Sequence, residues 1–353
     1  MSPKTSLAAL EAVGVELHAA PETWTALAAD VLEGLSTTPK TLPPKWVYDA
    51  RGRELFDAIC EQPEYYPTRR EAALLRTRGP ALAGELAAAE VIELGSGSST
   101  KSPLLLDPLH ERGTLRRYVP VDVSASAMEA AMPGLAARYP GVEITAHVSD
   151  FTAGLAPLRE RTVDGPRVVA FLGSTIGNLQ PPEVHAFFGA VRELLAPGDV
   201  LLLGHDLVKS PSIVEPAYDD AAGVTADFNR NVLRVINREL QADFDEERFT
   251  HEATWNPMLE RIEIRLRATE PQVVRIASLG LEVTFLEGES ILTEISRKFR
   301  PEVIERSAVR AGLALRAWYE DADGWYGVSL LERACSDVAD LRGDRRARGP
   351  ARA

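Results

Sequence analysis

Val91-Ile92-Glu93-Leu94-Gly95-Ser96-Gly97-Ser98-Ser99-Thr100 joins a short apolar run to a glycine turn. Four more short apolar runs follow it along the chain, with amphipathic segments such as Met128–Tyr139 and Pro182–Leu195 between them: Tyr118–Val121, Val142–Ala146, Val168–Leu172 and Val200–Leu203. Buried strands that alternate with helices predict a parallel sheet covered on both faces. The expected fold class is therefore α/β.

The glycine turn indicates a ligand site at the end of the first strand. Gly95 and Gly97 let the backbone turn tightly and approach a ligand without a Cβ atom. Thr100 stands where the dinucleotide fingerprint has its third glycine, and Asp122 ends the second strand, where a carboxylate can accept both hydroxyls of a ribose. The combination favours a nucleoside ligand without a pyrophosphate. The alternative is an ordinary tight turn between a strand and a helix.

Asp150-Phe151 follows the third strand and adds an acceptor for an adenine amine and an apolar edge. Each acid alone could be a solvated strand end or a helix N-cap. Ligands of open α/β sheets bind at the carboxyl ends of the strands, where these features converge. Since the chain also ends in a predicted hairpin, Ala314–Trp318 with Gly327–Leu331, the layout is similar to the S-adenosylmethionine-dependent methyltransferase fold.

Outward from this core the patterns change. The N-terminal part is mostly helix and loop, including a helix that a capping box at Thr68 and Glu71 would open. Between about 209 and 298 the alternation stops, and a helix at Thr225–Leu240 precedes strands with period-two patterning, such as Glu260–Ala268. We expect a Rossmann-like core and a second, α+β substrate-binding domain made of the N-terminal helices and this insertion. The predicted boundaries are 1–66 and 209–298 for the second domain, 67–208 and 299–333 for the core, and 334–353 for a disordered arginine-rich tail.

The composition of the chain argues against several classes of protein. The chain has 353 residues, of which 39 are basic and 52 acidic, giving a net charge of −13 that argues against binding to nucleic acid. No apolar run approaches the roughly 20 residues of a membrane span, and the first 20 residues lack the pattern of a secretory signal. Two cysteines fit a reducing compartment. We expect a cytoplasmic monomeric enzyme that acts on a small molecule.

Several motifs make the resemblance specific. They are LPPKWVY at Leu42–Tyr48, PEYYPTR at Pro63–Arg69, FLGSTIGNL at Phe171–Leu179, AYDDAAGVTADFNRN at Ala217–Asn231, LTEIS at Leu292–Ser296 and KFRPE at Lys298–Glu302. Together they resemble the histidine-specific Nα-methyltransferases of ergothioneine biosynthesis, over roughly residues 35–331. The resemblance implies trimethylation of the α-amino group of L-histidine by S-adenosylmethionine, which gives hercynine.

The resemblance also implies roles for individual residues. Those expected to hold the cofactor are Tyr48, Gly95, Lys101, Asp122, Asp150 and Phe151. Those expected around the substrate are Tyr65, Gly173, Asn178, Tyr218, Glu294 and Ser296. Tyr48 and Asn178 would be catalytic, Asn178 and Tyr218 would lie near the amino and carboxylate groups, and Glu294 and Ser296 would meet the imidazole. Two departures from the family are Val47, where an aromatic residue is common, and Ile264, where a methionine can line the side-chain pocket.

Taken alone, these residues have simpler interpretations. Tyr65 could pack against a helix start, Asn178 after Gly177 could belong to a turn, and Glu294 could face solvent from a strand. Asp219-Asp220 could be a charged loop, and no sequence spacing typical of a metal site is present. The competing functions are a betaine-forming methyltransferase for another amino acid, a non-catalytic nucleoside-binding module, and an NAD oxidoreductase, which Thr100 disfavours.

The expected chemistry is an in-line displacement from a sulfonium, which the cofactor has already activated. Aligning two reactants contributes about 7–11 kcal/mol, whereas an amine with a pKa near 7.7–8.0 needs only about 1.4 kcal/mol per pH unit to lose its proton. We therefore expect positioning by Tyr48 and Asn178, with no obligate general base and no covalent intermediate. Selectivity is expected from Glu294, because a buried polar partner rejects mismatched side chains far better than an apolar pocket does.

Overall fold

A computed structural model describes residues 15–19, 23–97, 99, 101–150 and 155–334. Its large sheet has eight strands in the order β1-β5-β4-β3-β6-β7-β14-β13. All neighbours are parallel except β14, which runs antiparallel to both β7 and β13. The strands are β1 (Val15–Ala19), β3 (Glu90–Leu94), β4 (Arg117–Asp122), β5 (Glu143–Val148), β6 (Arg167–Phe171), β7 (Val200–Asp206), β13 (Leu313–Glu320) and β14 (Tyr326–Arg333). The predicted α/β class and terminal hairpin are confirmed.

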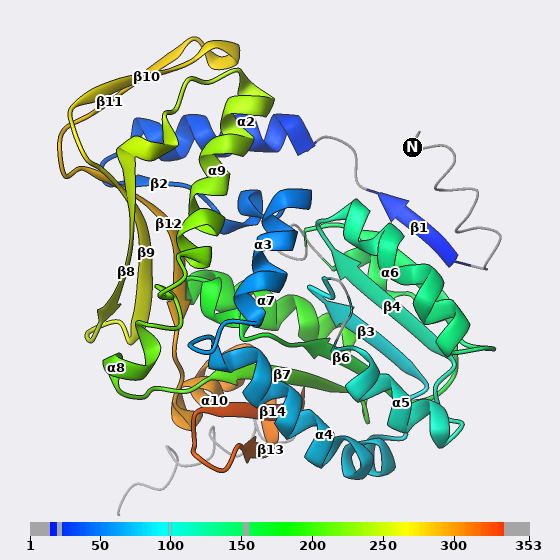
Figure 1. Ribbon diagram of the computed structural model, residues 1–353. Coiled ribbons are helices and arrows are strands. Elements are labelled where there is room, and N and C mark those ends of the chain that lie inside the picture. The colour runs from blue at the N-terminus through cyan, green and yellow to red at the C-terminus, as the bar shows by residue number, and fades with distance from the viewer. Residues whose placement is uncertain (1–14, 20–22, 98, 100, 151–154, 335–353) are drawn as a thin grey trace, which may run out of the picture.

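Helices cover both faces of this sheet (Figure 1). One face packs against α4 (Tyr66–Leu86), α5 (Pro103–Glu111) and α6 (Ala125–Arg138), and the other against α7 (Pro181–Leu194) and α10 (Pro301–Arg310). Successive side chains of a strand point to opposite faces, so Val91 contributes to one core and Ile92 to the other. Burial on both faces explains why the strands appear as continuous apolar runs in the sequence.

A smaller unit stands at the left of Figure 1. Its sheet has the order β2-β12-β9-β8, with a separate antiparallel hairpin of β10 and β11. Its strands are β2 (Lys40–Thr41), β8 (Phe249–Asn256), β9 (Arg261–Ala268), β10 (Gln272–Ile276), β11 (Leu281–Phe285) and β12 (Ser290–Arg297). Its helices are α2 (Thr23–Ser36), α3 (Ala50–Cys60), α8 (Pro211–Val214) and α9 (Val224–Leu240).

One hydrophobic core joins the two parts of the chain that make this unit. It contains Leu27 and Val31 of α2 together with Val232 and Ile236 of α9. Helix α3 lies between the units, since it contacts α9 on one side and α4 and α6 on the other (Figure 1). The short 3-10 helices are η1 (Pro44–Val47), η2 (Ala156–Arg159), η3 (Thr175–Asn178), η4 (Glu246–Arg248) and η5 (Ala277–Leu279).

Three differences from the sequence analysis stand out. Strands β1 and β8 were not predicted, and the capping box at Thr68 and Glu71 is wrong, because α4 begins at Tyr66 and has Pro67 in its first turn. Ala334 was assigned to the disordered tail, yet its backbone N–H binds the carbonyl of Gly312 at 3.0 Å. Residues 335–353 lie outside the described residues.

No helix in the described ranges is long and apolar enough to cross a membrane.

Candidate active site

The glycine turn after β3 leaves open space in front of its backbone. Gly95 and Gly97 have φ angles of +70° and +57°, a region that side chains with a Cβ atom rarely adopt. Among described residues, no heavy atom lies within 4 Å of the place where a Cβ on Gly95 would stand. The Gly95 N–H is bonded to the Val121 carbonyl at 2.7 Å, which fixes the turn against β4. Thr100 lies outside the described residues.

Asp122, the last residue of β4, points at this turn. Its Oδ2 accepts from the Gly97 N–H at 2.8 Å, and its Oδ1 accepts from Arg53 at 2.8 Å and from the Ser124 N–H at 2.9 Å. A carboxylate accepts about four hydrogen bonds. A ligand diol that donates two would therefore have to displace Arg53. Sequence reasoning did not find Arg53, although it stands only five residues after the LPPKWVY motif.

Lys101 belongs to a buried network beside the turn. Its ammonium pairs with Glu71, which also accepts from the Gly173 N–H at 2.7 Å and the Tyr326 hydroxyl at 2.6 Å. Burial would lower the pKa of Lys101, but the Glu71 carboxylate outweighs it and raises that pKa. Gly173 follows β6 with φ of +75°. Glu71 thus joins two loops at the carboxyl edge of the sheet instead of capping α4.

Asp150 lies just past the end of β5. Its Oδ2 accepts from the Lys45 ammonium at 3.5 Å, and Lys45 also pairs with Asp30 at 3.1 Å. The LPPKWVY segment is therefore tied to the third strand of the predicted cofactor site. Phe151 lies outside the described residues.

Tyr48 follows η1 and stands between the two groups of predicted site residues. Asn231 of α9 holds its loop by donating to the Val47 carbonyl at 3.0 Å and to Asp49 at 2.7 Å. The pKa of Tyr48 is raised well above its usual value, first by burial and then by the charge of Glu294, with Asp122 adding to the effect and Arg53 opposing it. The Arg53 guanidinium, which pairs with Asp122, lies 5.9 Å from the centroid of the Tyr48 ring.

Glu294 and Ser296 reach the pocket because β12 contains a bulge. The register against β9 shifts by one at Thr293, so that Glu294 lies opposite Ile264 and Ser296 follows on the same face. In an unbroken register, Thr293 and Ile295 would instead lie opposite Ile264 and Ile262. Ile264, which stands where relatives can have a methionine, is therefore the cross-strand neighbour of Glu294.

Asn178, at the end of η3, meets Glu294 from the core side. Its amide nitrogen donates to Glu294 Oε1 at 3.0 Å. Helix η3 approaches β12 so closely that a Cβ on Gly177 would stand 2.8 Å from the Arg297 carbonyl oxygen. Burial raises the pKa of Glu294 to about 7, against the lowering effects of Lys298 and Asn178. Glu294 is thus an acid that changes charge near neutral pH.

Tyr218 and Ser296 form a hydroxyl pair, with their oxygens 2.8 Å apart. Lys298 donates to Tyr218 at 2.7 Å and to Ser296 at 2.8 Å. Tyr65 packs edge-on against Tyr218, with ring centroids 6.0 Å apart, and closes this side of the pocket. Lys298 belongs to the quoted KFRPE motif, but sequence reasoning gave it no role.

The structure therefore arranges the described candidates in two neighbouring groups. One surrounds the glycine turn and the other surrounds Glu294, with Tyr48 between them. Asp220, which was interpreted as part of a charged loop, caps α9 by accepting from the backbone of Val224 and Thr225. Within the described ranges, no group of three or more His, Cys, Asp or Glu side chains could hold a metal ion.

Comparison of the sequence with known proteins identifies the family of the chain. A family model described as histidine-specific methyltransferase, SAM-dependent, matches residues 27–333. The chain is 51% identical over 308 residues to the histidine N-alpha-methyltransferases of Mycolicibacterium smegmatis and Mycobacterium tuberculosis, covering 87% of this chain and 95% of each relative. It is 28% identical to an L-tryptophan methyltransferase of Psilocybe serbica, covering 86% of this chain and 92% of that protein. The chain belongs to the family of histidine-specific, S-adenosylmethionine-dependent methyltransferases.

Proposed function

We propose that this protein transfers three methyl groups from S-adenosylmethionine to the α-amino nitrogen of L-histidine, giving the betaine hercynine, the first step of ergothioneine biosynthesis. Family membership and 51% identity to two histidine N-alpha-methyltransferases support the proposal. The observation that carries it is the position of Tyr48. The guanidinium of Arg53, which pairs with Asp122 at the glycine turn, lies 5.9 Å from its ring centroid. On another side its ring packs on Phe56, which contacts Tyr65 beside Tyr218. Two ligands bound at these places would meet at Tyr48.

The residues at the glycine turn fit S-adenosylmethionine. The open space at Gly95, the positive φ angles and the carboxylate of Asp122 suit a nucleoside held by backbone and ribose contacts. Lys101 would add a positive charge beside the turn, and Asp150 an acceptor after the third strand. When bound, the cofactor supplies a methyl group activated by its sulfonium charge.

Tyr48 and Asn178 would orient the amine. The raised pKa of Tyr48 keeps its hydroxyl protonated near neutral pH, so it orients by hydrogen bonding and does not act as a phenolate base. The Asn178 amide nitrogen is engaged by Glu294, which leaves its Oδ1 to accept an N–H of the substrate amine. Alignment of this kind contributes about 7–11 kcal/mol, more than the deprotonation of an amine requires. Transfer stops at three methyl groups because the quaternary nitrogen has no lone pair.

Glu294 would supply the selectivity for histidine. Its carboxylate would accept one ring N–H, and the hydroxyl pair of Tyr218 and Ser296 would meet the rest of the substrate. Ile264, directly opposite Glu294 in the sheet, would line the pocket beside the ring. An amino acid that cannot donate to Glu294 would leave one oxygen of this buried carboxylate without a hydrogen bond, because Asn178 bonds only to Oε1, and that is costly.

The small unit would act as the substrate-binding domain. Its core joins the N-terminal helices to the insertion, which supports the assignment of 23–66 and 209–298 to it, with 67–208 and 299–333 forming the catalytic core. Strand β1, within the proposed piece 1–66, instead belongs to the large sheet. The cytoplasmic, monomeric state and the lack of nucleic-acid binding stay predictions.

Mass spectrometry of purified protein with S-adenosylmethionine tests the proposal. Histidine should gain the mass of three methyl groups, while tryptophan and phenylalanine in parallel reactions should stay unmodified. Preferential methylation of another amino acid would favour the alternative of a betaine-forming enzyme with a different substrate. A lack of methylation of every amino acid would overturn the proposal.

A further inference from the structure

Lys298 is a fully buried cation at the back of the polar pocket. Its side chain has an exposed fraction of 0%, and its ammonium lies 2.8 Å from Asp206 Oδ2, 2.7 Å from Tyr218 Oη and 2.8 Å from Ser296 Oγ. An ammonium has three N–H donors and no acceptor. The three contacts therefore use all of its hydrogen-bonding capacity.

The charge of Lys298 is maintained by Asp206. Burial would lower the pKa of Lys298, but the Asp206 carboxylate outweighs it and raises that pKa. The side chain is therefore an ammonium at neutral pH, and it always donates to the two hydroxyls. Tyr218 and Ser296 each accept one hydrogen bond from it.

This arrangement determines what the hydroxyl pair can offer a ligand. Tyr218 and Ser296 lie 2.8 Å apart, so one of their two O–H groups is used between them. Among described residues, only Lys298 and the two hydroxyls themselves hydrogen-bond to the pair. One O–H is therefore left over, and it can be satisfied only by an acceptor atom in the pocket or by water.

Glu294 and Ser296 are spaced to hold a five-membered ring. They stand two residues apart on one face of β12, about 7 Å along the strand. A ring with an acceptor nitrogen and a donor N–H can bridge that span with one hydrogen bond at each end. The ionised carboxylate of Glu294 can only accept hydrogen bonds. The Tyr218–Ser296 pair can donate one hydrogen bond.

We propose that Lys298 is a positioning residue that holds the Ser296–Tyr218 pair as a hydrogen-bond donor, so that the pocket selects a neutral imidazole with its N–H toward Glu294 and its bare nitrogen toward the pair. The inference rests on the proposed function and adds which form of the substrate ring is bound. Lys298 acts through the two hydroxyls and does not touch the reacting atoms.

Lys209 provides a matched control. It pairs with the other oxygen of Asp206 and donates to the Tyr66 hydroxyl at 2.8 Å and to the Leu207 carbonyl, but it does not reach the hydroxyl pair. Its side chain is also buried, with an exposed fraction of 5%. Removing either lysine takes one cation from Asp206, and only one of them contacts Ser296 and Tyr218.

Calorimetric titration of the full chain loaded with S-adenosylhomocysteine tests this. The ligands are histidine and the two β-pyrrolylalanines, which keep one ring N–H and replace the other nitrogen by C–H. In the wild type, histidine should bind roughly 10–100-fold more tightly than the better pyrrole analogue, the effect of one buried unpaired hydroxyl. Lys298→Met should reduce this ratio to near one, whereas Lys209→Met should keep it. The Kd for S-adenosylhomocysteine should be unchanged in both.

An equal loss of discrimination in both lysine variants would show that Lys298 has a merely structural role, and it would overturn the inference. Full discrimination in Lys298→Met would also overturn it. If a Met variant fails to bind S-adenosylhomocysteine, the pair Lys298→Gln and Lys209→Gln replaces it, with the same expected ranking. A wild type that binds neither histidine nor the analogues would instead contradict the proposed function, so the two failures are distinguishable.

Discussion

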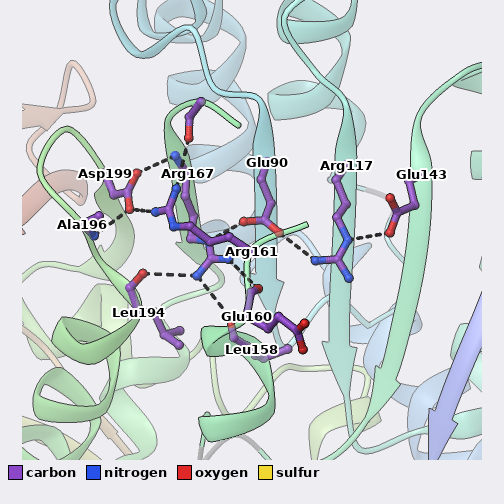
Figure 2. A network of polar contacts seen from close by, with 11 residues as sticks. Glu90, Arg117, Glu143, Leu158, Glu160, Arg161, Arg167, Leu194, Ala196 and Asp199 are labelled. Carbon is purple, nitrogen blue, oxygen red and sulfur yellow. Dashed lines mark hydrogen bonds and ion pairs between the residues drawn. The ribbon is translucent and has the colours of Figure 1, made fainter. Parts of the chain in front are cut away.

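At the edge of the large sheet where β3, β4 and β6 begin, Arg167 is completely buried and every guanidinium nitrogen has a partner (Figure 2). Its Nε donates to Glu90, Nη1 to the carbonyls of Leu158 at 3.1 Å and Leu194 at 3.2 Å, and Nη2 to the Glu160 carbonyl at 3.1 Å. The charge and hydrogen-bonding nitrogens of Arg167 are thus satisfied within the chain.

The opposite edge, where the same strands end, differs. Asp122 keeps acceptor capacity and Gly95 faces open space. On β12 of the small sheet, burial raises the pKa of Glu294 to about 7. Polar groups there are buried with hydrogen-bonding capacity left over. Such groups cost stability in the free protein and are favourable only when a ligand supplies the missing partners.

The comparison separates two uses of buried charge in one molecule. A closed network such as that of Arg167 holds strand ends together, and breaking it should affect folding. An open arrangement such as that of Glu294 should affect binding and chemistry.

The largest effect is expected for Glu294→Ala. Losing the acceptor for the ring N–H should lower the preference for histidine over phenylalanine, measured as the ratio of kcat/KM values, by on the order of 10⁴-fold. The Kd for S-adenosylhomocysteine should stay unchanged. Glu263→Ala serves as a control. Glu263 lies on β9, the strand beside β12, and pairs with Arg261 and Arg265 of the same strand. An unchanged histidine preference in Glu294→Ala would refute the assignment.

Arg167→Met should have the largest effect on folding. It leaves the buried Glu90 carboxylate with Arg117 as its remaining ion-pair partner and removes the donor to three backbone carbonyls. The free energy of unfolding in urea should therefore fall by about 3–5 kcal/mol. Under conditions where the variant is folded, its Kd for S-adenosylhomocysteine should equal that of the wild type. Arg138→Met, which removes an exposed ion pair with Asp107, should leave the free energy of unfolding nearly unchanged. Similar losses in the two variants would contradict the closed-network interpretation.

Asp122→Ala should weaken cofactor binding with a smaller effect than either change above. Loss of a buried acceptor predicts a rise in the Kd for S-adenosylhomocysteine of roughly 10–100-fold by calorimetry. Asp107→Ala is the control, since Asp107 also accepts from an arginine and a tyrosine but lies on α5, away from the turn. Equal affinities for the wild type and Asp122→Ala would rule out the ribose role.

The smallest expected effect is on the pH dependence of stability. The folded pKa of Glu294 lies above that of an unfolded glutamate, so its favourable protonated form is complete below about pH 4.5 and is lost as the pH rises through about 7. Glu294→Gln should therefore be more stable than the wild type by roughly 1–3 kcal/mol at pH 8, with little difference at pH 5. The exposed Glu287→Gln serves as the control for the loss of one carboxylate. A pH-independent difference for Glu294→Gln would contradict the raised pKa.

The sequence predicted the parts of the fold that depend on local patterns. Apolar runs such as Val168–Leu172 marked strands because both faces of the sheet are covered. Strand β8 was missed because its buried face carries His251 and Ala253, so its sequence lacks the apolar alternation that revealed β9. Glu71 was misassigned because a Thr-x-x-Glu pattern fits a helix start, whereas its real partners, Gly173 and Tyr326, lie 102 and 255 residues away in the chain.

The same reasoning applies to the site. Asp122 was predictable from its place at a strand end beside a glycine turn. Glu294 was reached only through the family resemblance, because strand alternation alone does not reveal that the bulge at Thr293 changes which side chains face the pocket. Lys298 and Asn231 act through contacts with distant segments, so no local spacing indicates them.

A crystal structure of the complex with S-adenosylhomocysteine and histidine would test the central claim most directly. It should place the histidine amine beside Tyr48 and Asn178, facing the sulfur, with the imidazole between Glu294 and Ser296 and the nucleoside on Asp122. Histidine bound outside the Glu294 pocket, or an amine directed away from the sulfur, would contradict the account.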